Sequence, residues 1–106
     1  MKFSVDKSKI IHEFQSLAAV ADKKQTLPIL SNILIRCEAD NIKMLSTDLH
    51  FELEVHLQDA TITEPGEITI PAKKAADIIR ELPDGEVSFE LNEESSKLTV
   101  KSSSGR

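Results

Sequence analysis

The amino-acid sequence predicts an α+β domain made of two βαβββ units, with the helices on one face of the sheets. Most of the chain alternates apolar and polar residues over short stretches, which is the period of a strand with one buried face. Only two stretches place apolar residues at helical spacing, and each directly follows a strand. At 106 residues, the chain is one domain at most or part of a larger one.

The first unit begins with a strand and a helix. Met1, Phe3 and Val5 alternate with polar residues, and Asp6 is placed to cap the helix that follows. The helix extends to about residue 21, and the polar residues 22–26 predict a loop. Its apolar stripe consists of Ile10, Ile11, Phe14, Leu17, Ala18 and Ala21.

Three strands complete the first unit. Pro28 has no N–H and suits a strand start, so the apolar run 29–37 is expected to be the second strand. A turn at Asp40-Asn41 then leads into a short strand over 42–46. Clean alternation predicts the next strand over 50–57, and Glu64-Pro65-Gly66 predicts a turn. In that strand the apolar residues are Phe51, Leu53, Val55 and Leu57, and the polar ones are His50, Glu52, Glu54 and His56.

The same order of elements then starts again. Ile68 and Ile70 form a strand, Pro71 stands at the entrance of the second helix, and the segment 83–85 ends that helix. The residues 87–91 and 98–100 alternate on either side of a turn, and the expected last strand is missing from this chain. The second helical stripe consists of Ala75, Ala76, Ile79 and Leu82.

The two halves match at a constant offset of sixty-five residues, which favours an internal repeat. Any two strand–helix units share some periodicity, so similar elements without duplication remain an alternative. The matched pairs are Phe3 with Ile68, Val5 with Ile70, Ile10 and Ile11 with Ala75 and Ala76, Phe14 with Ile79, Leu17 with Leu82, and Lys9 with Lys74.

Charge is unevenly distributed along the chain. The net charge of -5 argues against a protein that coats nucleic acid indiscriminately. The helical segments 7–24 and 72–82 nevertheless carry seven cations against four anions, a net charge of +3, which leaves −8 on the remainder. A basic helical face can meet a phosphate backbone, but helix surfaces are also commonly lysine-rich for solubility alone, so both interpretations stay open. The cations are Lys7, Lys9, Lys23, Lys24, Lys73, Lys74 and Arg80.

The sequence offers little evidence of catalysis. It contains no glycine-rich phosphate loop and no GxSxG, CxxC or HExxH motif. His50 and His56 lie about 20 Å apart along one strand, so a solvated sheet face is favoured over a metal site. Asp48 is expected to serve in a turn, and His12 to lie at the surface.

Cysteine usage and hydropathy predict the compartment. Cys37 is the single cysteine, expected to be an inert buried thiol, so no intrachain disulfide can form and a reducing compartment is indicated. The N-terminus has no apolar run of signal-peptide length, and no segment is apolar enough to span a bilayer. A cytoplasmic protein without a membrane partner is expected.

Four segments together resemble the bacterial sliding clamp family, the beta subunit of DNA polymerase III. Each segment is weak evidence by itself, but all four occur in order and near the family's spacing. The likeness covers nearly the whole chain and is to the N-terminal domain, residues 1–106 here, which two further similar domains follow in the family. The segments are MKFSV (1–5), TLPILSNILI (26–35), STDLHFELE (46–54) and PGEITIPAKKAADIIRELPDG (65–85).

The resemblance implies a ring without enzymatic activity or cofactors. Family members are head-to-tail homodimers whose helices line a central hole around duplex DNA, with continuous sheets outside. The ring tethers the replicative polymerase and contacts DNA without reading its sequence. The pocket for peptides of the polymerase and the clamp loader is built from later domains.

The resemblance also assigns roles to individual residues. Lys24 and Lys73 match basic DNA-facing positions, and Lys74 and Arg106 match positions near the ring-closing interface. Lys9 and Arg80 join the DNA-facing set only because they lie in the helical segments.

Two other functions remain open from the residues themselves. One is a stand-alone βαβββ module that binds protein and not DNA. The other is a small hydrolase or metal enzyme that uses His50, Glu52 or Asp48.

Overall fold

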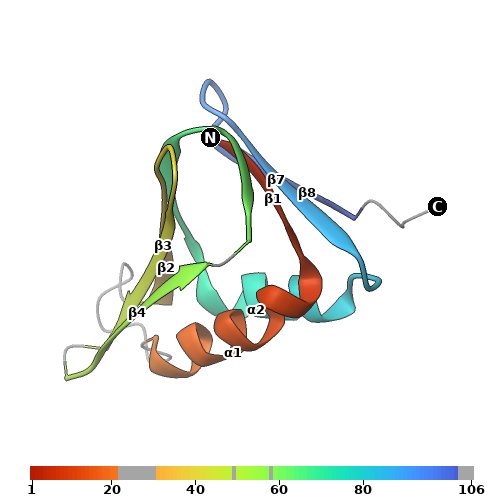
Figure 1. Ribbon diagram of the computed structural model, residues 1–106. Coiled ribbons are helices and arrows are strands. Elements are labelled where there is room, and N and C mark those ends of the chain that lie inside the picture. The colour runs from red at the N-terminus through yellow and green to blue at the C-terminus, as the bar shows by residue number, and fades with distance from the viewer. Residues whose placement is uncertain (22–30, 49, 58, 103–106) are drawn as a thin grey trace.

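The computed structural model describes residues 1–21, 31–48, 50–57 and 59–102. These residues form two four-stranded antiparallel sheets and two helices (Figure 1), so the α+β prediction is confirmed. The elements are β1 (Lys2–Asp6), the 3-10 turn η1 (Lys7–Lys9), α1 (Ile11–Val20), β2 (Asn32–Cys37), β3 (Ile42–Thr47), β4 (Glu52–Leu57), β5 (Thr61–Glu64), β6 (Gly66–Pro71), α2 (Ala72–Glu81), β7 (Glu86–Asn92) and β8 (Lys97–Ser102).

The two sheets have related topologies. Their strand orders are β5-β1-β7-β8 and β4-β3-β2-β6, and β1 pairs with β7 as β6 pairs with β2. Val5 pairs with Val87 in one sheet, and Ile70 pairs with Ile33 in the other. Val5 and Ile70 are 65 positions apart as predicted, whereas Ile33 and Val87 are 54 apart. The offset of 65 residues therefore does not extend past the helices, because α1 and β2 are separated by more residues than α2 and β7.

The sheets converge at one end of the domain and diverge toward the helices, which lie side by side across the open end (Figure 1). β5 and β6 are separated by Pro65 alone and belong to different sheets, so they join the two sheets. Gly66 is required at this junction because a Cβ there would lie 2.7 Å from the Cβ of Met1. The prediction of a simple turn over 64–66 is thus corrected to a strand crossing between sheets. β5 was not predicted because Ile62 is its only apolar residue.

The core lies between the inner faces of the sheets and the helices. Phe89 of β7 stacks on Phe3 of β1 and on Phe14 of α1, with ring centroids 4.7 and 6.3 Å apart. Ser46 is the buried polar residue of the described core, and its Oγ donates a hydrogen bond to the Leu17 carbonyl at 2.8 Å. The helical stripe predicted for the first unit therefore packs as expected.

The two helices begin differently. Asp6 was predicted to cap α1, but its side chain caps the 3-10 turn η1 by accepting a hydrogen bond from the Ser8 backbone N–H at 2.9 Å. α1 then starts at Ile11. Pro71 precedes α2 directly, as predicted, and provides no side-chain cap.

The prediction for one apolar residue of the alternating pattern is wrong. Phe51 was predicted to share the buried face of its strand, but its side chain is 71% exposed and β4 begins one residue later. The reason is a tight turn, in which the Asp48 carboxylate accepts hydrogen bonds from the backbone N–H groups of His50 and Phe51. The turn role predicted for Asp48 is confirmed.

Candidate nucleic-acid interface

A shallow groove of about 210 Å³ runs between α1 and α2 on the surface of the helical layer. Lys73 and Arg80 line it from α2, and Gln15, Ala18 and Ala19 line it from α1. Ala18 and Ala19 have short side chains, so the long cationic side chains of α2 extend further over the groove. The structure therefore brings together two of the four residues predicted to contact DNA.

The amphipathic sequence of α2 explains this placement. Ala72, Ala76 and Ile79 are buried, so the positions between them along the helix face outward. The side chains of Lys73 and Arg80 are 82% and 57% exposed. Both cations therefore remain accessible to a ligand on the outer side of the helical layer.

The C-terminal end of α2 is held by a residue from the other half of the chain. Lys7 Nζ donates hydrogen bonds to the backbone carbonyls of Arg80 and Leu82. The Lys7 N–H also donates to the Gly85 carbonyl at 2.8 Å. A lysine at this end satisfies unpaired carbonyls and complements the negative end of the helix dipole. Lys7 is thus part of the framework, although the charge count grouped it with the other helical cations.

An acidic side chain lies between the two groove cations. The Asp77 carboxylate is 3.7 Å from Lys73 Nζ and 3.3 Å from an Arg80 guanidinium nitrogen. Arg80 also lies 3.9 Å from the Glu81 carboxylate. The charged residues that line the groove are Lys73, Arg80 and Asp77, with a net formal charge of +1, so the groove is a mixed-charge surface and not a simple basic patch.

Lys9 occupies a different place. Its amino group is 3.4 Å from the carboxylate of Asp59, in the connection between β4 and β5. Lys9 is not among the residues that line the α1–α2 groove. The structure therefore separates this predicted contact from Lys73 and Arg80.

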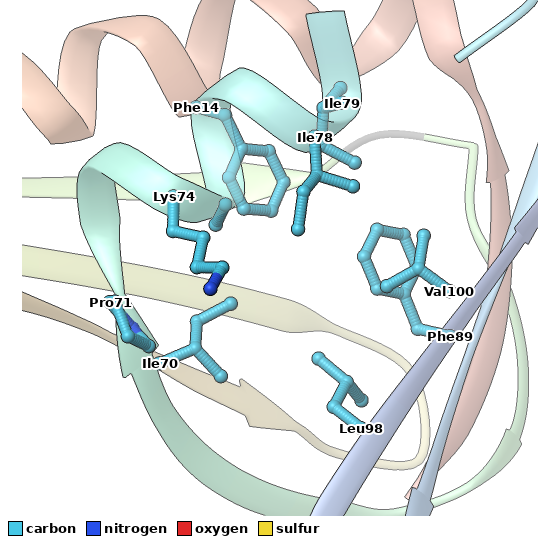
Figure 2. A pocket seen from close by; sticks show the side chains of 10 residues that line it. Phe14, Ile70, Pro71, Lys74, Ile78, Ile79, Phe89, Leu98 and Val100 are labelled. Atoms are coloured by element: carbon cyan, nitrogen blue, oxygen red, sulfur yellow. The ribbon is translucent and has the colours of Figure 1, made fainter. Parts of the chain in front are cut away.

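Lys74 lies beside a second, apolar groove of about 230 Å³ (Figure 2). This groove runs between α2 and β8, with Ile78 on one wall and Leu98 and Val100 on the other. Ile78 is 42% exposed, which is unusual for a large apolar side chain. Lys74 thus adjoins this apolar surface, and both Lys73 and Lys74 line a further groove beside Ile78 and Leu82. Lys24 and Arg106 lie outside the described residues.

The polar residues in and before β4 that were considered for catalysis or metal binding make local hydrogen bonds. Hydrogen bonds from the backbone of Phe51 and His50 hold the pKa of Asp48 below its ordinary value. His56 bridges Glu54 and Asn41 at 2.9 and 3.2 Å, and the hydrogen bond from His56 lowers the pKa of Glu54. Across 1–21, 31–48, 50–57 and 59–102, no three His, Cys, Asp or Glu side chains are grouped to hold a metal.

Two further surface and core predictions are confirmed. Cys37 is buried, and burial raises the pKa of its thiol. His12 is exposed on α1. In the part of the chain that the structure describes, neither helix is long and apolar enough to cross a membrane.

The fold and the helical layer define a domain of the DNA clamp class. The family model described as DNA polymerase III beta subunit, N-terminal domain, matches residues 1–106, and the chain belongs to this family. The resemblance seen in the sequence is therefore confirmed.

Curated relatives and solved structures agree with this assignment. The chain is 40% identical to the beta sliding clamp of Pseudomonas aeruginosa over 108 residues, covering 100% of this chain and 29% of the relative. It is 33% identical to the DNA polymerase sliding clamp of Caulobacter crescentus, whose crystal structure superposes with a TM-score of 0.89 and is covered to 29%, against 100% of this chain. A DNA polymerase III subunit beta from Pseudomonas aeruginosa has a TM-score of 0.84 at 37% identity, with 100% and 28% of the two chains covered. The chain thus spans under a third of the length of these relatives.

Sequence reasoning overlooked Asp77 as part of the candidate interface. Its spacing could have revealed it, because residues three and four apart are neighbours on a helix surface. Asp77 follows Lys73 by four positions and precedes Arg80 by three. The role of Lys7 had no such local signal, since its partners are more than seventy positions away.

Proposed function

We propose that this chain is the N-terminal domain of a ring-shaped DNA sliding clamp that encircles duplex DNA and tethers a replicative polymerase without catalysing a reaction. Two further similar domains would follow it, and the ring would close as a head-to-tail homodimer. Membership of the beta-subunit family supports this proposal across the full chain. Clamp-loader and polymerase peptides would bind the later domains, and no cofactor is needed.

The observation that carries the DNA contact is the exposed pair of cations in the α1–α2 groove. Lys73 and Arg80 line one groove, and their side chains are exposed. Phosphate contacts of this kind position a protein on the duplex but carry no sequence information. We assign Lys24, Lys73 and Arg80 to sequence-independent phosphate contact. Lys9 is a weaker member of this set because it does not line the α1–α2 groove.

The ring-closing contact is assigned to the α2–β8 side of the domain. Lys74 adjoins an apolar groove there, so one cation and an apolar surface are available together (Figure 2). Such a combination suits an interface with a second subunit, in which apolar burial gives affinity and a charge fixes the register. Arg106 belongs to the same proposed contact by its resemblance to the family.

Topology gives the decisive test of the ring. The complete ring-forming protein should stay on closed circular duplex DNA and be lost when the circle is cut, because a ring slides off free ends. Retention can be measured by gel filtration of labelled protein with the two DNA forms. Equal retention on both would overturn the topological mechanism.

Charge reversal tests the individual contacts. Lys24→Glu and Lys73→Glu should weaken duplex binding more in low salt than in high salt, because screening reduces phosphate attraction. Lys2→Glu, at an exposed position of β1, is the matched control with the same charge change. An unchanged salt dependence would remove the altered lysine from the set of contacts.

A further inference from the structure

We infer that Asp77 limits the attraction of the α1–α2 groove for phosphate, so that the contact with duplex DNA stays weak and exchanges readily. The inference rests on the proposed function and names a regulating residue within the same surface. Asp77 touches no DNA in this role. It acts through the two cations that it holds and through the negative charge that it adds to the groove.

The geometry makes Asp77 the common partner of both groove cations. Lys73 approaches its carboxylate from one helical turn before, and Arg80 from one turn after, with N–O distances of 3.7 and 3.3 Å. A phosphate that binds either cation must therefore compete with a carboxylate that is already in place. The Asp77 side chain is 43% exposed and lines the groove itself, so its charge also acts directly on any approaching phosphate.

The charges show how large the effect of Asp77 should be. The charged residues that line the groove, Lys73, Arg80 and Asp77, have a net formal charge of +1, and removing the Asp77 charge raises it to +2. One additional phosphate neutralised on B-DNA steepens the slope of log K against log salt by about 0.9. A unit charge at contact distance in water changes the affinity by about fivefold.

This restraint suits a contact that must slide. A groove with two unopposed cations would dwell longer at each pair of phosphates, whereas an internal carboxylate offers each cation an alternative partner when it leaves the DNA. The same principle operates at Lys9, which shares its charge with Asp59 on another part of the surface. The position of Asp77 between two cations gives it the larger influence.

The test compares variants that each lose one charged side chain. Their binding to a short fluorescent duplex is measured over a range of salt concentrations. Asp77→Asn should bind about fivefold more tightly at low salt, with a salt slope steeper by about 0.9. Glu93→Gln is the matched control, because it removes one negative charge in the β7–β8 turn, which lies at the end away from the helices (Figure 1). Equal effects of the two variants would overturn the inference, since net charge alone would then explain them.

Lys73→Gln separates this inference from the proposed function. If Lys73→Gln weakens binding while Asp77→Asn leaves it unchanged, the DNA contact stands and the role of Asp77 is overturned. If Lys73→Gln and Asp77→Asn both leave binding unchanged, Lys73 is removed from the set of contacts and the role of Asp77 is overturned, while retention on circular DNA still tests the proposed function separately. In the double variant, the gain from Asp77→Asn should be smaller than in the parent chain, because one of the restrained cations is gone. A full gain in that background would contradict the restraint of Lys73. Circular dichroism of Asp77→Asn confirms that the helices are retained, and Asp77→Ser provides a second neutral variant.

Discussion

The helices α1 and α2 occupy related places in the two halves of the fold, yet they serve different purposes. α1 inserts the large side chains of Phe14 and Leu17 into the core and has few charges. α2 buries mainly small side chains and directs five charged residues outward. The two repeats therefore differ in role: α1 contributes large side chains to the core, and α2 carries most of the charged side chains of the two helices. The five charged residues are Lys73, Lys74, Asp77, Arg80 and Glu81.

The largest difference between the halves should appear at a matched pair of leucines. Leu17 and Leu82 are 65 positions apart, but Leu17 is fully buried within α1 whereas Leu82 follows the last residue of α2 and is half-buried. Leu17→Ala should lower the free energy of unfolding by about 3 kcal/mol, because the rigid surroundings cannot fill the cavity. Leu82→Ala should cost about 1 kcal/mol, since less apolar surface is removed from water there.

Urea denaturation of the two variants measures this difference. The slope of unfolding free energy against urea should remain that of the parent chain, so that the midpoint reports stability directly. Equal losses of stability for Leu17→Ala and Leu82→Ala would show that the two halves pack equivalently. That result would contradict the different roles of α1 and α2.

Most elements of this fold are predictable because one face of each is buried. The apolar stripe of α1, the alternation in β7 and the proline before α2 all follow from local spacing. Phe51 was misplaced because hydrogen bonds to Asp48 form a turn that overrides the alternating pattern. β5 was missed because its pairing with β1 is a long-range contact that a single apolar residue does not reveal.

The candidate interface was predictable only in part. Helical spacing identifies Lys73 and Arg80 as cations of one helix, but it does not show which faces of two helices meet. The groove depends on the packing of α1 against α2, and the placement of Lys74 beside an apolar surface depends on where β8 lies. These features arise from tertiary contacts between residues far apart in the sequence.

A second difference between the halves concerns how the helices are held. Lys7→Met should remove the side-chain hydrogen bonds to the carbonyls of Arg80 and Leu82 and reduce stability by about 1–2 kcal/mol. Lys9→Met is the matched control, because its exposed ion pair with Asp59 contributes about 0.5 kcal/mol or less. Thermal denaturation should therefore show a clear drop in Tm for Lys7→Met alone. A similar drop for both variants would mean that loss of positive charge, and not the cap on α2, is responsible.

The smallest expected effect is on the stability of the chain in acid. It arises because the two helical segments begin with different residues, Asp6 and Pro71. The Asp6 carboxylate accepts hydrogen bonds from the Ser8 hydroxyl and backbone N–H, and these bonds lower the pKa of Asp6. A lowered pKa in the folded chain means that the cap stabilises it above the ordinary aspartate value of about 3.9 and is lost as pH falls through the lower folded value. Pro71, before α2, offers no group that titrates.

Asp6→Asn should therefore flatten the loss of stability as pH falls below the ordinary aspartate value, while the parent chain loses stability more steeply there. Ser8→Ala retains the carboxylate and the backbone hydrogen bond but removes the hydroxyl, so it should give an intermediate profile. Urea midpoints measured at successive pH values provide the comparison. A parent-like profile for Asp6→Asn would indicate that the cap at η1 adds no acid sensitivity, and that the two helix entrances respond to acid alike despite their different chemistry.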